Sequence, residues 1–141
     1  MVLTESFRGN GLWRAVLGAA IAGLGTCVVA GFGWWSARTG GMHLLSEIAA
    51  VLVLTAIGAT AGRISGRFRD APVSLAGAVI GAALAYQANY TIDPSWPRSE
   101  TLFAVWLVYA AVFLLPFIAG GHLLGAWAAN RSLRGARARR T

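Results

Sequence analysis

The stretch LFAVWLVYAAVFLLPFIAGGHLLGAWAA, residues Leu102–Ala129, contains no Asp, Glu, Lys or Arg. A helix rises 1.5 Å per residue, so about 20 apolar residues are enough to cross the hydrocarbon core of a bilayer. This run is long enough to tilt or to project beyond the lipid. Three further apolar blocks cover about residues 12–35, 44–62 and 72–90. The sequence therefore predicts an all-α, polytopic membrane protein with a bundle of four transmembrane helices.

The composition supports a membrane protein with a single domain. Only 12% of the 141 residues are charged and 57% are hydrophobic, whereas a soluble domain carries about 25% charged residues. So few charges cannot cover a water-facing surface. We expect residues 1–129 to form the four-helix transmembrane domain and residues 130–141 to form a basic cytoplasmic tail. The single cysteine, Cys27, excludes an internal disulfide bond.

The arginines predict the orientation. Arg38 and Arg98 fall in the first and third connections, whereas the other ten arginines fall at the termini and in the second connection. Short basic segments stay on the cytoplasmic side, so both termini are predicted to be cytoplasmic. All twelve basic residues are arginine, a bias that we interpret as a bacterial coding style. The predicted location is the bacterial inner membrane, with multiple passes.

Glycines recur at a spacing of four in two of the predicted helices. Gly58 and Gly62 lie at the end of the second helix, and Gly77 and Gly81 lie in the third. Small residues at this spacing let two helices approach closely in a membrane, where lipid supplies no hydrophobic drive for association. The pattern predicts helix packing at these four glycines, and it says nothing about chemistry.

Glu47 is a carboxylate inside an apolar block, about one turn from the outer surface. His43 lies four residues earlier on the same helix face, and Gln87 and Asn89 of the third helix fall at a similar depth. We therefore expect a polar cluster of His43, Glu47, Gln87 and Asn89. Three interpretations of Glu47 stay open: contact with headgroups and water, a buried structural hydrogen bond, or coupling to an ion or solute.

Two features of the fourth block concern its cytoplasmic half. Pro116 interrupts the helix in mid-membrane, and the adjacent Gly120 and Gly121 could accommodate a bend. His122 stands alone near the cytoplasmic end, and His43 falls at the opposite membrane face. We interpret His122 as a helix-contact residue rather than a haem ligand.

The C-terminal segment is strongly basic. Between residues 130 and 141 it carries Arg131, Arg134, Arg137, Arg139 and Arg140. Such a segment attracts anionic lipid headgroups. Nucleic-acid binding is not expected, because no aromatic residues are interleaved with the charges. The predicted partner of this tail is the lipid bilayer with its anionic headgroups.

The sequence favours a function without catalysis. It shows no Ser/His/Asp or Cys/His set, no paired carboxylates and no metal-ligand spacing, so we expect no catalytic residue, cofactor or metal. The leading hypothesis is a small integral membrane protein that acts through helix contacts as a subunit, stabiliser or modulator of a membrane assembly. The alternative is a homo-oligomeric transporter or channel subunit with Glu47 as the coupling residue. Its protein partner would be another membrane protein or the protein itself.

Overall fold

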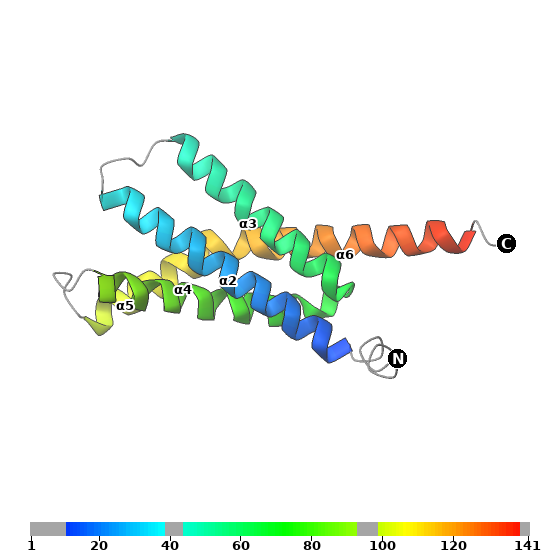
Figure 1. Cartoon of the computed structure of the whole chain (residues 1–141), viewed down its shortest axis with the longest axis horizontal. Coiled ribbons are helices and arrows are strands. Elements are labelled where there is room, and N and C mark those ends of the chain that lie inside the picture. Colours follow the sequence, from blue (N-terminus) through cyan, green and yellow to red (C-terminus); the bar gives the residue numbers. More distant parts are fainter. Residues whose placement is uncertain (1–10, 39–43, 93–98, 139–141) are drawn as a thin grey trace.

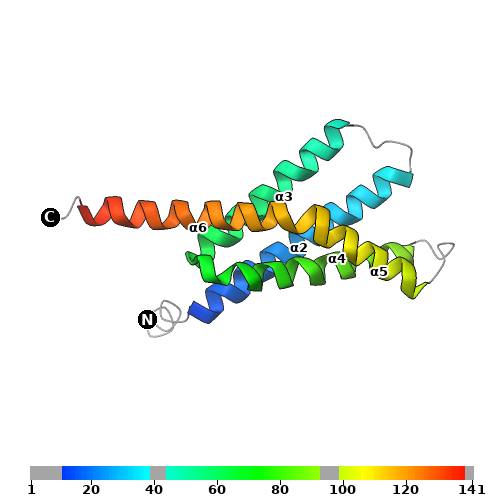
Figure 2. The same ribbon diagram turned by 180° about the vertical axis from the view of Figure 1, so that it is seen from behind.

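The computed structural model describes residues 11–38, 44–92 and 99–138, and within them it is all-helical. Four helical segments are long and apolar enough to cross a membrane, as predicted. They are α2 (Gly11–Arg38), α3 (Leu44–Ser65), α4 (Ala71–Ile92) and a fourth segment made of α5 (Glu100–Tyr109), η2 (Ala110–Leu114) and α6 (Leu115–Ala138). A short 3-10 helix, η1 (Phe68–Asp70), precedes α4. Figure 1 and Figure 2 show the helices crossing near their middles and spreading apart at the end opposite to the C-terminus.

The helix ends differ from the predicted ones by a few residues, except at the C-terminus. There, α6 continues to Ala138, through most of the segment that the sequence suggested as a separate tail. The extension projects past the other helices (Figure 1). Alanine, leucine and arginine are good helix formers, so the apolar helix continues after its hydrophobic run has ended.

Two helix pairs account for most of the packing: α2 with α4, and α3 with α6. Each pair approaches at small residues. A Cβ on Gly77 would collide with the Ala19 carbonyl, and one on Gly81 would collide with the Gly23 carbonyl. Because glycine has no side chain, the two backbones come into direct van der Waals contact and gain dispersion energy that larger residues would prevent.

The contact between α3 and α6 is reciprocal. A Cβ on Gly58 or Gly62 would meet the carbonyls of Ile118 and His122 on α6. In return, a Cβ on Gly121 or Gly125 would meet the carbonyls of Thr55 and Ala59 on α3. A side chain at any of the four glycines singled out from the sequence would therefore meet a backbone carbonyl of a neighbouring helix.

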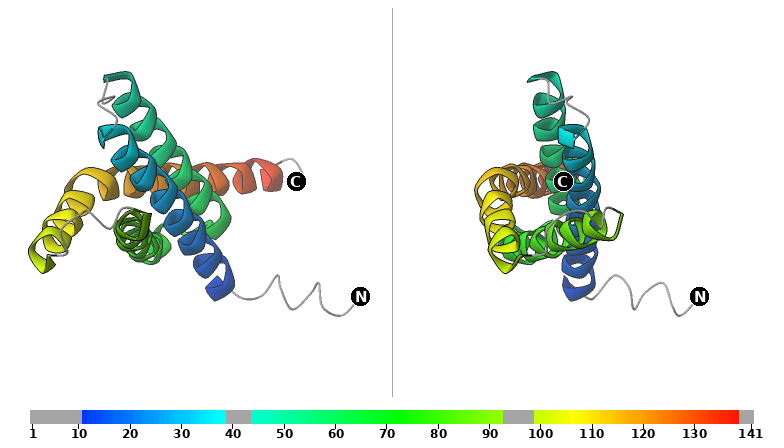
Figure 3. Two further views of the ribbon diagram at one scale, coloured as in Figure 1. Left: turned by 60° about the vertical axis from the view of Figure 1, so that its left-hand side comes forward. Right: turned by 90° about the vertical axis from the view of Figure 1, so that its left-hand side faces the viewer.

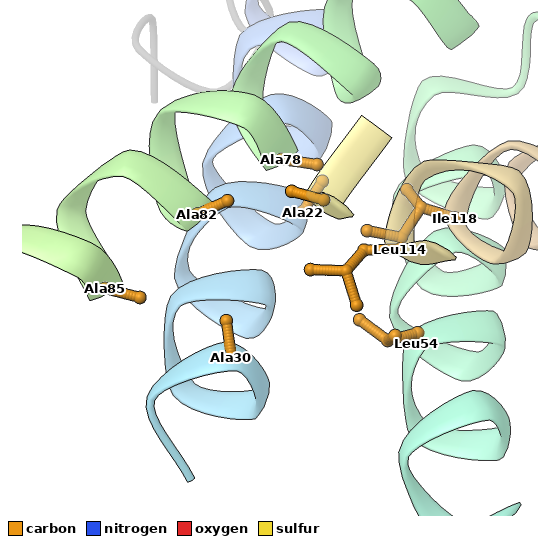
Figure 4. Close-up of a cluster of buried hydrophobic side chains, with 9 residues drawn as sticks. Ala22, Ala30, Leu54, Ala78, Ala82, Ala85, Leu114 and Ile118 are labelled. Carbon is orange, nitrogen blue, oxygen red and sulfur yellow. The ribbon is translucent and has the colours of Figure 1, made fainter. Parts of the chain in front are cut away.

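The interior between the two pairs is built mainly from alanine. Its buried members are Ala22, Ala30, Leu54, Ala78, Ala82, Ala85, Ala110, Leu114 and Ile118. Figure 4 shows the alanines of α2 and α4 facing one another, with Leu54, Leu114 and Ile118 filling the space toward α3 and α6. The larger apolar residues mostly point outward and are exposed. Small residues in the interior and larger apolar residues on the surface suit a bundle surrounded by lipid.

The fourth segment bends at a π-helical turn. In η2 the Leu115 N–H donates to the Ala110 carbonyl, five residues back, just before Pro116. The proline ring lacks an N–H and would clash with the carbonyl four residues earlier, and a π turn admits one extra residue at such a point. Figure 3 shows α5 turned away from α6. The bend therefore precedes Pro116, and Gly121 packs on α3 instead of forming a hinge.

Candidate functional site

His122 is the most deeply buried ionisable side chain among the residues that the structure describes, with no exposed area. Gly62 of α3 lies directly against the His122 backbone, so α6 approaches closely enough to insert the ring between the end of α3 and the start of α4. Gly18 of α2 faces the same place, and a Cβ there would lie 3.5 Å from the Ser74 hydroxyl. Glycines on two helices thus make room for the imidazole and its partner.

Both ring nitrogens of His122 have hydrogen-bond partners. Nε2 lies 3.1 Å from the Arg67 carbonyl oxygen and 3.5 Å from the Ser65 hydroxyl, and Nδ1 lies 3.0 Å from the Ser74 hydroxyl. A carbonyl only accepts, so Nε2 carries a hydrogen, and in the neutral ring Nδ1 accepts from Ser74. His122 with Ser65, Ser74 and the Arg67 carbonyl is called the His122 junction below.

The His122 junction fixes the turn between α3 and α4. Gly66 ends α3 with a φ of +67°, a left-handed conformation that favours glycine, and its N–H donates to the Gly62 carbonyl at 2.8 Å. Asn130 of α6 donates to the Gly66 carbonyl at 3.3 Å. Two side chains of α6, His122 and Asn130, therefore hold consecutive carbonyls of the turn.

Asp70 lies beside the His122 junction and is 8% exposed. Its backbone N–H donates to the same Arg67 carbonyl that accepts from His122, at 3.3 Å. Its Oδ2 atom is buried without a hydrogen-bond partner. A buried polar atom without a partner costs free energy, and Asp70 is the described residue at this end of the bundle that carries one.

Three of the four residues of the predicted polar cluster lie apart in the structure. Glu47 and Gln87 are exposed, and Asn89 is half-buried with an Nδ2 atom that has no hydrogen-bond partner; His43 lies outside the described residues. Since α3 pairs with α6 while α4 pairs with α2, the start of α3 and the end of α4 point to opposite edges of the bundle (Figure 1). Among the three described members, no hydrogen bond links Glu47 to the other two.

The C-terminal arginines are only partly described. Arg131 is exposed on α6, and its guanidinium carbon lies 5.2 Å from the centre of the Trp127 ring. Arg134 and Arg137 lie further along the same helix, and Arg139 and Arg140 lie outside the described residues. The charge nearest the bundle is thus held against the exposed Trp127 ring by a cation–π contact.

Within the described ranges, no group of three or more His, Cys, Asp or Glu residues could hold a metal ion. Cys27 is half-buried and packs against the alanine-rich interior. The His122 junction joins its segments by hydrogen bonds.

Sequence reasoning missed the partners of His122. Ser65 and Ser74 are 57 and 48 residues away from it in the chain, and no helical spacing connects residues on different helices. The available signal was weak: two serines and one aspartate flank the arginine-rich second connection, where polar residues are ordinary. Comparisons of the chain with protein-family models, with curated proteins and with solved structures find no match.

Proposed function

We propose that the protein is a multi-pass protein of a bacterial inner membrane and acts, without catalysis, as a subunit that stabilises or modulates a larger membrane assembly through helix contacts. The observation that carries this proposal is the exposure of α5. None of its ten residues is buried within the chain, although α5 belongs to an apolar segment. The other helices pack their small-residue faces against one another, whereas the outer face of α5 is available for contact with another protein.

The outer face of α5 has a regular surface. Val105 and Val108 of α5 are exposed at 60% and 63%, and their spacing of three places them on one side of the helix. Val112, in η2 just beyond, is exposed at 58%. On the inner side, the Trp106 Nε1–H donates to the Ala82 carbonyl at 2.8 Å, and Tyr86 packs on Phe103 with ring centres 5.2 Å apart. These contacts fix α5 to α4, so the exposed side chains of Val105 and Val108 are held in a defined direction. Residues three apart form one of the ridges along which a second helix packs.

A photocrosslinking amino acid at Val108 tests this role in native membranes. We expect one crosslinked product with a different membrane protein, and the same product from Val105 and Val112. Val28, exposed on α2, is the control and should give no such product. Products at all four positions alike, or none from the three valines, would contradict the proposal. A crosslink to a second copy would favour the homo-oligomeric alternative.

Both termini are proposed to be cytoplasmic, because ten of the twelve arginines fall on that side. Alkaline phosphatase fused after Gly40 or Ser95 should be active, and fused after Arg67 or Thr141 it should be inactive. Green fluorescent protein at the same points should give the opposite pattern. A single reversed fusion would break the four-span topology.

Substitution of Glu47 by glutamine should leave folding and assembly unchanged. Glu47 is exposed in the first turn of α3, a position that supports headgroup or solvent contact rather than a buried coupling role. The control measurement is proton or cation flux in proteoliposomes of both proteins. Reproducible flux that disappears in Glu47→Gln would replace the subunit proposal with the transporter alternative.

The extended end of α6 is proposed to bind anionic headgroups diffusely. Arg131 sits about one turn beyond the exposed Trp127, and Trp prefers the membrane interface. Each basic residue near an anionic surface contributes about 1 kcal/mol. Removing residues 131–141 should weaken the preference for anionic lipid while the bundle stays folded.

A further inference from the structure

α5 joins the rest of the fourth membrane segment where the helix is irregular. In η2 the Leu115 N–H donates to the Ala110 carbonyl, five residues back, and the next residue, Pro116, has no N–H to donate. Sharp bends in helices occur at prolines and π turns, because the regular hydrogen bonds are interrupted there. On the other side of η2, α6 is fixed, since Gly121 lies against the α3 backbone and His122 is held in its junction. The fourth segment therefore bends between a fixed helix and α5.

α5 is attached to the bundle mainly through α4. The Trp106 Nε1–H donates to the Ala82 carbonyl at 2.8 Å, and the Tyr86 ring centre lies 5.2 Å from that of Phe103 and 6.4 Å from that of Trp106. No residue of α5 is buried. Segments with few buried contacts separate from a fold at a lower free-energy cost than its core does, so α5 is the membrane helix that the fold holds least firmly.

The hydrogen bond of Trp106 can break without disrupting α4. Ala82 lies inside α4, and in a regular α-helix its carbonyl also faces the N–H four residues further on. The carbonyl therefore keeps a partner when the indole leaves, and only the indole N–H loses one. The Trp106 side chain also packs against the alanine-rich interior, to which Ala82 and Ala85 belong. Its departure would uncover part of that surface.

We propose that α5 is a movable arm that pivots at η2, and that the hydrogen bond from Trp106 to Ala82 is the latch that holds the arm on α4. In the latched state α5 lies as Figure 3 shows it, and in the released state it turns away from α4. The use of this motion rests on the subunit role proposed above. A partner that packs on Val105 and Val108 of the latched arm binds that state better and shifts the population toward it.

Double electron–electron resonance on the full chain in lipid nanodiscs tests the proposal. In a Cys27→Ala background, Glu100→Cys on α5 and Leu52→Cys on α3 carry the spin labels, and both positions are exposed. We expect a main distance and a minor second distance. Trp106→Phe should raise the ratio of the second to the first about threefold, the effect of losing one hydrogen bond between membrane helices. Tyr86→Leu, which keeps the indole donor but removes the ring contacts, should shift the ratio in the same direction.

Two further label pairs locate the pivot. Glu100 paired with Leu124, exposed on α6, should also give two distances, because η2 lies between them. Leu52 paired with Ile80, exposed on α4, leaves α5 out and should give one distance in every variant. A single distance between Glu100 and Leu124, or two between Leu52 and Ile80, would place the movement elsewhere and overturn the proposal.

The latch is tested by the two variants together. If neither Trp106→Phe nor Tyr86→Leu changes the distances measured from α5, the proposal is wrong. No partner protein is present in this experiment, so the absence of a crosslink from Val108 in native membranes would count against the subunit role alone.

Discussion

Replacing Gly121 by leucine should lower the melting temperature of the detergent-solubilised protein by about 10 °C, whereas the same change at the adjacent Gly120 should be tolerated. A side chain at Gly121 would meet the Thr55 carbonyl and the Ala59 N–H of α3, whereas one at Gly120 has nothing within 4 Å. Overpacking a tight contact costs about 1–3 kcal/mol and more where backbone blocks relief. For a chain of this size each kcal/mol moves the melting temperature by about 4 °C.

The two residues form a matched pair, because both are glycines in α6 and both substitutions raise helix propensity equally. Only the direction of the side chain differs. The contact between α2 and α4 offers an independent repeat: Gly81→Leu should be as damaging as Gly121→Leu, since the Gly23 carbonyl lies against it. Equal melting temperatures for the Gly120 and Gly121 variants would show that α3 and α6 do not pack as described.

The second large effect is expected at His122. Its replacement by leucine should reduce the free energy of unfolding by about 2 kcal/mol, because the Arg67 carbonyl and the Ser74 hydroxyl lose a buried partner. Single hydrogen bonds between membrane helices average about 0.6 kcal/mol, and here several are lost together. Unfolding in a graded mixture of mild detergent and sodium dodecyl sulfate measures the change.

A double-mutant cycle with Ser74→Ala assigns the effect to the junction rather than to the size of the ring. Once Ser74 is alanine, His122→Leu leaves one polar group fewer without a partner. The loss of unfolding free energy in the double variant should therefore be smaller than the sum of the losses in the two single variants. Thr60→Ala is the control for the serine change, because the Thr60 hydroxyl is exposed and bonds only to its own helix at Ala56. Strict additivity of His122→Leu and Ser74→Ala would contradict the contact between them.

The sequence by itself determined that four helices long and apolar enough to span a membrane would form, and roughly where. The reason is local: a backbone in hydrocarbon must satisfy its own hydrogen bonds, so each long apolar run becomes a helix whatever surrounds it. The glycine spacing likewise marked Gly58, Gly62, Gly77 and Gly81 as residues for close approach. Such a spacing indicates which face of a helix packs closely, but it does not indicate which other helix packs against that face.

Only the tertiary structure decided the pairing of α2 with α4 and of α3 with α6, because between apolar helices the choice depends on matching shapes rather than on hydrophobicity. That pairing separated Glu47 from Gln87 and Asn89, which a different arrangement would have joined. It also brought Ser65 and Ser74 to His122 from other segments, turning an apparently isolated histidine into the link between α3, α4 and α6. Depth in the membrane can be estimated from one helix at a time, whereas a contact between side chains requires the position of both helices.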